Sequence, residues 1–166
     1  ALCARVGLVN GTLLLHGLAH RFVIRDGADV LQRHVKEALG QLLSGQGATS
    51  YSRGSFNNHF GVPLSLERLQ QTAEFAVFEL GMNHAGELIP LSQMVRPIGA
   101  IVTTVEPAHI EFFSSVDDIA RAKAEIFQGL EKGGTAILNR DNGYYELLAK
   151  AAEAAGAGKI IGFGSH

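Results

Sequence analysis

Three polar side chains stand at or just after apolar stretches that we predict to be strands. Glu79 ends the run FAVFEL, His109 follows Val105 by four residues, and Asn139 ends the run TAILN. Ligands of open α/β sheets lie beyond the carboxyl ends of the strands, so these positions are candidates for a binding site. Each residue can equally be a capping or loop residue. Glu79 has the strongest case, because a carboxylate within an apolar strand needs a partner and a metal ion is a common one.

Lys123 stands within an apolar helical stripe. The predicted helix at 115–130 places the following residues on one face: Val116, Ile119, Ala120, Lys123, Ile126, Phe127 and Leu130. Their spacing is that of a buried face. The lysine can snorkel to solvent, but a buried amine can act as a nucleophile or accept a covalent modification. We favour a functional role for Lys123 over a structural one.

Two loops and one turn carry further polar candidates. Asn57 and Asn58 lie in SFNNHFGVP, where they can be turn residues or can bind phosphate or peptide groups with their amides. His84 lies in the glycine-flanked loop GMNHAGE, as a ligand-binding residue or as part of an ordinary loop. Asp141 follows Asn139 closely, and both can cap the next helix.

These candidates need strands and helices to position them. We predict helices at 31–43, 64–71, 87–95, 115–130 and 143–156, and strands at 74–80, 98–105, 135–139 and 158–163. Apolar strands separated by helices indicate a parallel sheet covered on both faces, and therefore an α/β fold. The first helix has an apolar stripe of Leu31, Val35, Leu39 and Leu42. Upstream of residue 30 the pattern is weak, with short strands conceivable at 6–9 and 21–25.

Composition restricts the function classes. The 166 residues are 46% hydrophobic and have a net charge of −2, which argues against nucleic acid or a membrane surface as partner. The single cysteine, Cys3, permits no internal disulfide and suits a reducing cytoplasm. The chain starts at Ala1 rather than Met, so we expect a piece of a larger protein. The phosphate-binding pattern G-x-x-x-x-G-K-[ST] does not occur in the sequence.

Five motifs in order resemble one known family. The runs FNNHFGVPLSL, FELGMNHAGE, TTVEPAHIEFF, AKAEIFQGL and AILNRDN are similar to the central domain of Mur ligases, and most similar to the MurF type. The resemblance covers about residues 36–166 and leaves residues 1–35 as an atypical segment. It implies a P-loop NTPase-like parallel-sheet domain, incomplete at its N-terminal edge. Such ligases have three domains, so the resemblance also implies N- and C-terminal domains of the same ligase as partners.

The resemblance implies a reaction and a cellular setting. MurF-type ligases act in peptidoglycan precursor synthesis in the bacterial cytoplasm, using ATP and Mg²⁺. ATP phosphorylates the carboxylate of UDP-N-acetylmuramoyl-tripeptide, and the amine of D-alanyl-D-alanine attacks the acyl phosphate. This implies phosphoryl transfer that depends on positioning and charge.

The resemblance also implies roles for individual residues. Glu79 and His109 match the magnesium-binding glutamate and histidine of the family, and Lys123 matches a lysine that is carbamylated and then helps to hold a second magnesium. Asn139 and Asp141 match the segment that contacts adenine. Asn57 and Asn58 match a segment that lines the substrate cleft, and His84 lies in the motif beside them.

The sequence departs from the family pattern just before Lys36. The family has T-G-S-x-G-K-T-x-T there, and an ungapped match places Gln32 at its lysine and Arg33 at its threonine. Glutamine carries no charge for phosphates, and arginine cannot ligate a cation. A reading-frame error or gene decay would explain the departure. We therefore expect a ligase fragment that is inactive alone. The alternatives are a non-catalytic nucleotide-binding or interaction module, or a ligase like folylpolyglutamate synthase.

Overall fold

The structure is a computed structural model, and it describes residues 5–9, 12–16, 20–25, 29–51, 54, 56–107 and 110–165. Within these ranges, the side chains of residues 5–9, 12–16, 29–33 and 110 are not described. No helix in the described part of the chain is long and apolar enough to span a membrane.

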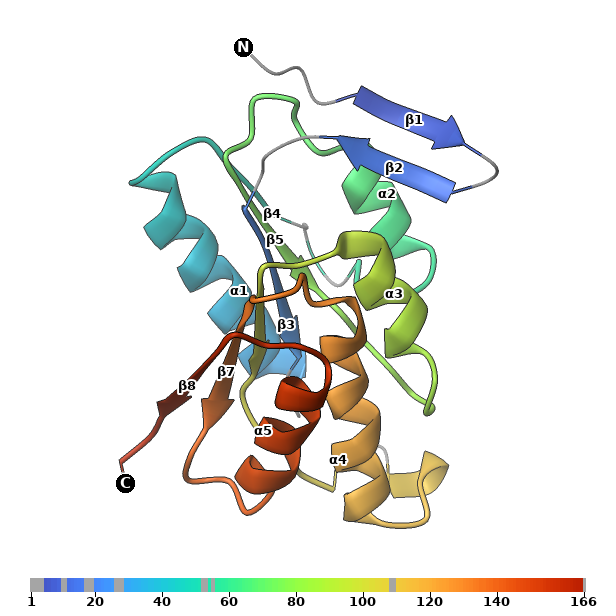
Figure 1. Cartoon of the computed structure of the whole chain (residues 1–166), viewed down its shortest axis with the longest axis vertical. Coiled ribbons are helices and arrows are strands. Elements are labelled where there is room, and N and C mark those ends of the chain that lie inside the picture. Colours follow the sequence, from blue (N-terminus) through green and yellow to red (C-terminus); the bar gives the residue numbers. More distant parts are fainter. Residues whose placement is uncertain are drawn as a thin grey trace.

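A six-stranded parallel sheet forms the centre of the described structure (Figure 1), with the order β4-β5-β3-β6-β7-β8. The strands are β3 (His20–Arg25), β4 (Thr49–Tyr51), β5 (Phe75–Glu79), β6 (Gly99–Val102), β7 (Thr135–Asn139) and β8 (Lys159–Phe163). Two further strands, β1 (Arg5–Val9) and β2 (Thr12–His16), pair antiparallel as a separate ribbon. The predicted parallel α/β sheet is therefore confirmed.

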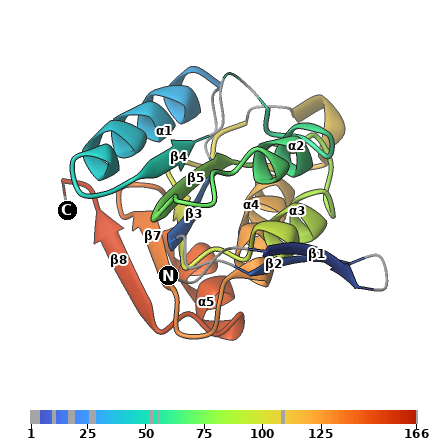
Figure 2. The ribbon, with the colours of Figure 1, turned by 90° about the horizontal axis from the view of Figure 1, so that it is seen from above.

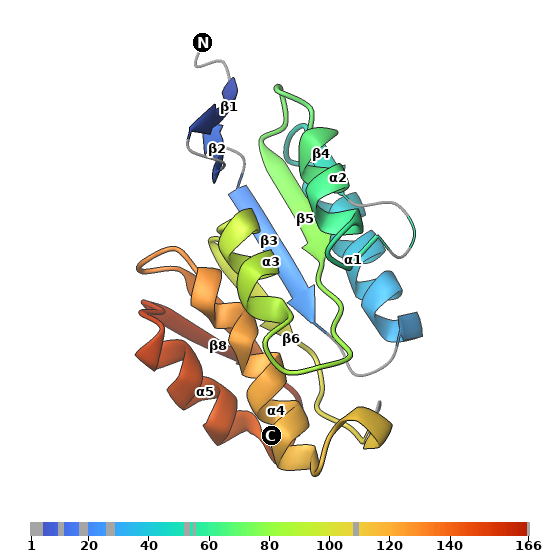
Figure 3. The ribbon, with the colours of Figure 1, turned by 90° about the vertical axis from the view of Figure 1, so that its right-hand side faces the viewer.

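Helices cover both faces of the sheet, as Figures 2 and 3 show. They are α1 (Asp29–Ser44), α2 (Gly61–Glu67), α3 (Leu88–Val95), α4 (Val116–Ala124) and α5 (Tyr145–Ala154), with 3₁₀ turns η1 (Ile110–Phe112) and η2 (Glu125–Gly129). Alternate residues of β3 divide between two cores: Val23 packs with the helices from α2 onward, and Ile24 packs with α1. This period-two alternation is what a strand buried on both faces requires.

Strand β3 lies in the middle of the sheet, between β5 and β6. Phe22 pairs with Val77 on one side and with Gly99 on the other. The short strands conceivable at 6–9 and 21–25 are both present, as β1 and β3. The second of them, although weakly patterned, provides the central strand that precedes α1.

The buried face of α1 differs from the predicted stripe. Leu42 is 69% exposed, whereas Lys36, Gly40 and Leu43 are buried. The predicted stripe consisted of apolar residues at helical spacing only. The buried face instead follows positions 36, 39, 40 and 43, which bring a lysine and a glycine inward.

Two other helices begin or end differently from prediction. Helix α2 starts at Gly61, three residues before the predicted start, because the Asn58 Oδ1 accepts hydrogen bonds from the amides of Phe60 and Gly61. Pro63 then lies in the first turn, where a proline is tolerated. The predicted helix at 115–130 ends as an α-helix at Ala124 and continues as the 3₁₀ turn η2.

Candidate functional site

Glu79 lies at the carboxyl end of β5, opposite Ile24 of the central strand. Its side chain is 2% exposed. The Lys36 Nζ lies 3.1 Å from Glu79 Oε2, and the Asn57 Nδ2 donates to Glu79 Oε1 over 2.9 Å. The partner that a carboxylate in an apolar strand needs is therefore provided by the chain itself.

Lys36 is a buried cation that the sequence analysis did not single out as a site residue. Its side chain is 1% exposed, and Nζ also donates to the Gly54 carbonyl over 2.6 Å. A buried charge is tolerated only with such partners. Lys36 thus joins α1 to β5 and to the segment after β4.

Gly81 allows Asn57 to reach Glu79. The Gly81 amide donates to the Asn57 carbonyl over 2.7 Å, and a Cβ at Gly81 would lie 2.8 Å from the Asn57 amide group. A larger residue would therefore displace that group. Asn57 and Glu79, both predicted site residues, are brought together here, whereas Asn58 starts α2.

Lys123 lies on the buried face of α4 and is 1% exposed, so the predicted burial is confirmed and snorkelling is wrong. The Lys123 Nζ donates to the Thr104 carbonyl over 2.6 Å. Thr104 follows β6, and β3 lies between that strand and β5. Glu79 at the end of β5 and the Thr104 carbonyl that binds Lys123 after β6 thus lie at the same edge of the sheet, on either side of the central strand. His109, the third member of the predicted trio, lies outside the described residues.

Asn142 fixes the segment that leads from β6 toward His109, a role that the sequence analysis missed. The Asn142 Nδ2 donates to Thr104 Oγ1 over 3.2 Å and to the Val105 carbonyl over 3.0 Å. Its Oδ1 accepts from the Tyr144 amide at the start of α5. The sequence signal was the NRDN turn, which predicts a cap but not these contacts.

Asn139 and Asp141 order the turn after β7. The Asn139 Oδ1 accepts from the Asp141 amide over 2.9 Å, and the Asp141 carboxylate accepts from the amide and hydroxyl of Ser165. Both lie at the carboxyl edge of the sheet, as predicted. Their proposed adenine contacts stay a prediction.

The loop after β5 is ordered by two carboxylates. Glu87 Oε2 accepts from the amides of Asn83 and His84, and the His84 Nδ1 lies 3.2 Å from Glu87 Oε1. Partial burial favours a higher pKa for Glu87, but these hydrogen bonds outweigh it and the pKa is lowered. The exposed His84 ring also contacts the Phe112 ring in a tilted arrangement, 5.1 Å between centroids, in the segment after His109.

Glu125 holds the same loop from the other side. Its Oε1 accepts from the Gly86 amide over 2.7 Å. Burial of the carboxyl raises its pKa, although hydrogen bonds from Gly86 and Leu88 act in the opposite direction. The junction of α4 and η2 therefore fixes the loop that carries His84.

Arg25 adds a buried guanidinium at the end of the central strand. It is 3% exposed, and its carbonyl accepts from the Thr103 amide beyond β6. Its signal in the sequence was an arginine that ends the otherwise apolar run FVIR. Together, Arg25, Lys36 and Lys123 are three buried cationic side chains near the carboxyl edge of the described sheet.

The magnesium site implied by the resemblance can be compared with this arrangement. Mg²⁺ gives up its water reluctantly and needs room around each carboxylate ligand. Glu79 is almost fully buried, and both of its oxygens already accept hydrogen bonds. In the described ranges, no group of three or more His, Cys, Asp or Glu residues could hold a metal ion. The residues as arranged do not fit a hydrated Mg²⁺ at Glu79.

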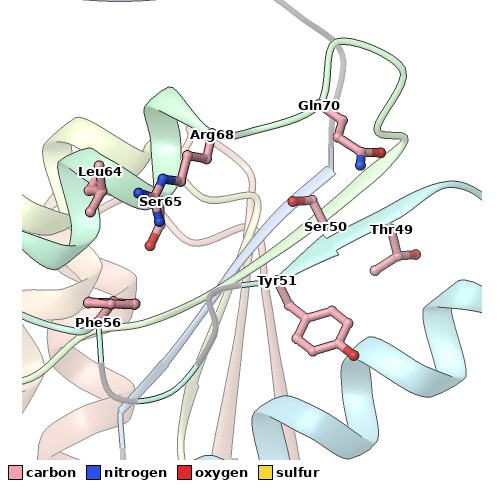
Figure 4. Close-up of a pocket in the computed structure, with 8 residues that line it drawn as sticks. All are labelled: Thr49, Ser50, Tyr51, Phe56, Leu64, Ser65, Arg68 and Gln70. Carbon is pink, nitrogen blue, oxygen red and sulfur yellow. The ribbon is translucent and has the colours of Figure 1, made fainter.

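A cavity of about 600 Å³ adjoins this site on the side of β4 (Figure 4). It lies between the β4 edge and α2 and combines aromatic rings, hydroxyl groups and one cation. Its lining residues are Thr49, Ser50, Tyr51, Phe56, Leu64, Ser65, Arg68 and Gln70. Phe56 precedes Asn57 directly, so the cavity and the Glu79 cluster share one segment.

Comparisons with known proteins give one consistent family. The profile of the Mur ligase middle domain matches residues 34–166. The UDP-N-acetylmuramoyl-tripeptide–D-alanyl-D-alanine ligase of Rickettsia prowazekii is 40% identical over 129 residues, which cover 78% of this chain and 29% of the relative. The Escherichia coli K12 ligase of the same name is 45% identical over 108 residues, covering 65% of this chain and 24% of the relative.

The fold comparison agrees. MurF from Acinetobacter baumannii has a TM-score of 0.80 at 32% identity, covering 89% of this chain and 31% of that protein. This likeness extends further along the chain than the profile match does. The chain spans between a quarter and a third of the length of these relatives.

Proposed function

This chain belongs to the Mur ligase family, and we propose that it serves as the central domain of a MurF-type ligase. The proposed reaction joins D-alanyl-D-alanine to UDP-N-acetylmuramoyl-tripeptide in the bacterial cytoplasm. A carboxylate oxygen of the tripeptide attacks the γ-phosphorus of ATP and ADP leaves. The amine nitrogen then attacks the acyl carbon, phosphate leaves and the nitrogen loses a proton.

One observation carries the proposal: two buried polar side chains and a half-buried one lie at the carboxyl edge of the sheet. The three residues come from separate motifs. Glu79 ends β5 and Asn139 ends β7, and Lys123 is hydrogen-bonded to the carbonyl of Thr104, just after β6. This edge is where open α/β sheets bind ligands. Carbamylation of Lys123, the adenine contacts of Asn139 and Asp141, and metal binding by His109 belong to this proposal.

The missing phosphate-binding pattern limits which reactions the chain can carry out alone. Gln32 and Arg33 lie within α1, at the positions of the family's lysine and threonine. We expect no ligation and no phosphate release from this chain with ATP, the tripeptide nucleotide and D-alanyl-D-alanine. Formation of the pentapeptide nucleotide by the chain alone would contradict this expectation.

A chimera tests the proposed function directly. Residues 34–166 replace the matching segment of the E. coli ligase, which retains its own phosphate-binding loop and other domains. We expect the chimera to form the UDP-linked pentapeptide, measured by mass spectrometry, and to release phosphate. The same chimera with Lys123→Met, which removes the proposed carbamylation site, is the matched control and should be inactive. A folded chimera that forms no product would refute the assignment.

The non-catalytic nucleotide-binding module is the second candidate, favoured by Gln32 and Arg33. Ligands that bind only the native state raise the melting temperature by mass action. A clear rise with ATP and Mg²⁺ for the unaltered chain would support a surviving nucleotide site. The folylpolyglutamate synthase-like alternative is disfavoured, because the relatives described above are D-alanyl-D-alanine ligases.

A further inference from the structure

The Lys36–Glu79 pair is the most buried ion pair among the described residues. The two side chains are 1% and 2% exposed, and they come from positions 43 residues apart. Neither the family likeness nor the proposed reaction gives Lys36 a role. Its contacts nevertheless place an ammonium group directly on the carboxylate that the likeness assigns to a metal.

The geometry around Glu79 is that of an occupied cation site. The ammonium lies 3.1 Å from Oε2, and the Asn57 amide lies 2.9 Å from Oε1. The Gly54 carbonyl, 2.6 Å from the same ammonium, is a second oxygen acceptor for Nζ. Carboxylate and carbonyl oxygens are also the ligands of hard divalent cations. The ammonium therefore uses the kind of oxygen cluster that a metal ion would use.

Charge and space both oppose a second cation here. A metal ion at Glu79 would lie beside a fixed ammonium of the same sign, in a region where screening by water is weak. The lysine cannot withdraw to solvent without leaving its buried position on α1. Exchange of one cation for the other therefore requires Lys36 to move or to lose its charge.

We propose that Lys36 is the resident counter-ion of Glu79, and that it prevents free divalent cations from binding at this carboxylate. The inference deepens the proposed function, since it concerns a residue of the same site. It is independent of ligation, because it describes how the chain responds to the metal ion alone. An active chimera would therefore neither support nor contradict the inference about Lys36, and an inactive chimera would not refute it.

Titration of the ¹⁵N-labelled chain with Mn²⁺ tests the inference, because bound Mn²⁺ broadens nearby amide signals. The amides of Leu80 and Gly81 follow Glu79 and report on the site. In the unaltered chain we expect no selective broadening of these signals up to millimolar Mn²⁺. In Lys36→Met and Lys36→Gln, selective and saturable broadening should appear at Mn²⁺ concentrations about tenfold lower or less, because the like charge is removed.

Two controls distinguish a gain in Mn²⁺ binding at Glu79 from a general gain in Mn²⁺ binding. Lys36→Met combined with Glu79→Gln should lose the broadening again. Lys132→Met removes an exposed lysine and should leave the Leu80 and Gly81 signals as in the unaltered chain. Lys36→Gln keeps a hydrogen-bond donor and provides the measurement if Lys36→Met does not fold.

Two results would overturn the inference. One is selective broadening around Glu79 in the unaltered chain at the same Mn²⁺ concentration as in the neutral variants. The other is a folded Lys36→Gln variant with no gain in Mn²⁺ binding at these amides.

Discussion

Removing one charge of the buried Lys36–Glu79 pair should destabilise the domain far more than removing both. Glu79→Gln removes the carboxylate and leaves the Lys36 ammonium buried, with its hydrogen bond to the Gly54 carbonyl. Lys36→Met removes the ammonium and leaves the Glu79 carboxylate buried, with its hydrogen bond from the Asn57 amide. The double variant Lys36→Met/Glu79→Gln removes both charges while keeping an acceptor for Asn57.

The structure sets the magnitude of the expected loss in the free energy of unfolding. At the 3.1 Å separation, the Coulomb attraction is about 5 kcal/mol for an effective dielectric constant of about 20. Breaking a buried pair from one side typically costs about 3–5 kcal/mol. The double variant should lose only about 1–3 kcal/mol, the cost of a buried amide without a full set of partners. The two single changes should therefore be strongly non-additive, with a coupling of at least about 3 kcal/mol.

Urea-induced unfolding followed by circular dichroism measures these free energies of unfolding. Glu131→Gln is the control, since its ion pair with Arg96 is only partly buried and should contribute about 1 kcal/mol or less. Single variants that are too unstable in buffer can be measured in trimethylamine N-oxide, which strengthens burial. If either single variant unfolds like Glu131→Gln, or if the double variant is as unstable as the sum of the singles, the buried pair does not have the role described.

Three further changes test other parts of the structure. The new methyl group of Gly129→Ala would overlap the backbone of α3, so this change should lower the free energy of unfolding by about 1–3 kcal/mol or more. Gly143→Ala is the control, because a Cβ there meets nothing within 4 Å. It should have little effect in the same urea measurement. Gly81→Ala should shift the side-chain amide signals of Asn57 in ¹⁵N spectra, because the new methyl group would occupy the place of that amide; unchanged signals would contradict the close approach. Glu125 has a pKa raised by burial from the ordinary 4.5, so its contribution to stability should be present below about pH 4.5 and be lost as pH rises through the raised pKa. Melting temperatures against pH should show this loss in the unaltered chain and not in Glu125→Gln, and parallel profiles would refute it.

Local patterns predicted the helices, the strands from β5 onward and one buried lysine, but not the strands β2 and β4. Lys123 stands on an apolar stripe of helical period, and its burial follows from that period. The same test applied to positions 36, 39, 40 and 43 of α1 would have predicted that Lys36 is buried. It was missed because Leu42, which in fact faces solvent, completed a more apolar stripe.

Long-range pairings could not be predicted. The contact between Lys36 and Glu79 depends on how α1 packs against β5, and no local period encodes that arrangement. The contact of Asn142 with Thr104 likewise joins two loops through the sheet order. The change from α-helix to 3₁₀ turn at Glu125 had no sequence signal that we can identify.

The central position of β3 has a consequence for how the chain folds during synthesis. Both of its neighbours come much later in the sequence, at 75–79 and 99–102. At roughly 5–20 residues per second, β3 leaves the ribosome several seconds before it has either partner. During that time its apolar centre, Phe22 to Ile24, has two unpaired edges, which is a risk for aggregation. The positive charges of Arg21 and Arg25 on either side are suited to keep such nascent strands apart.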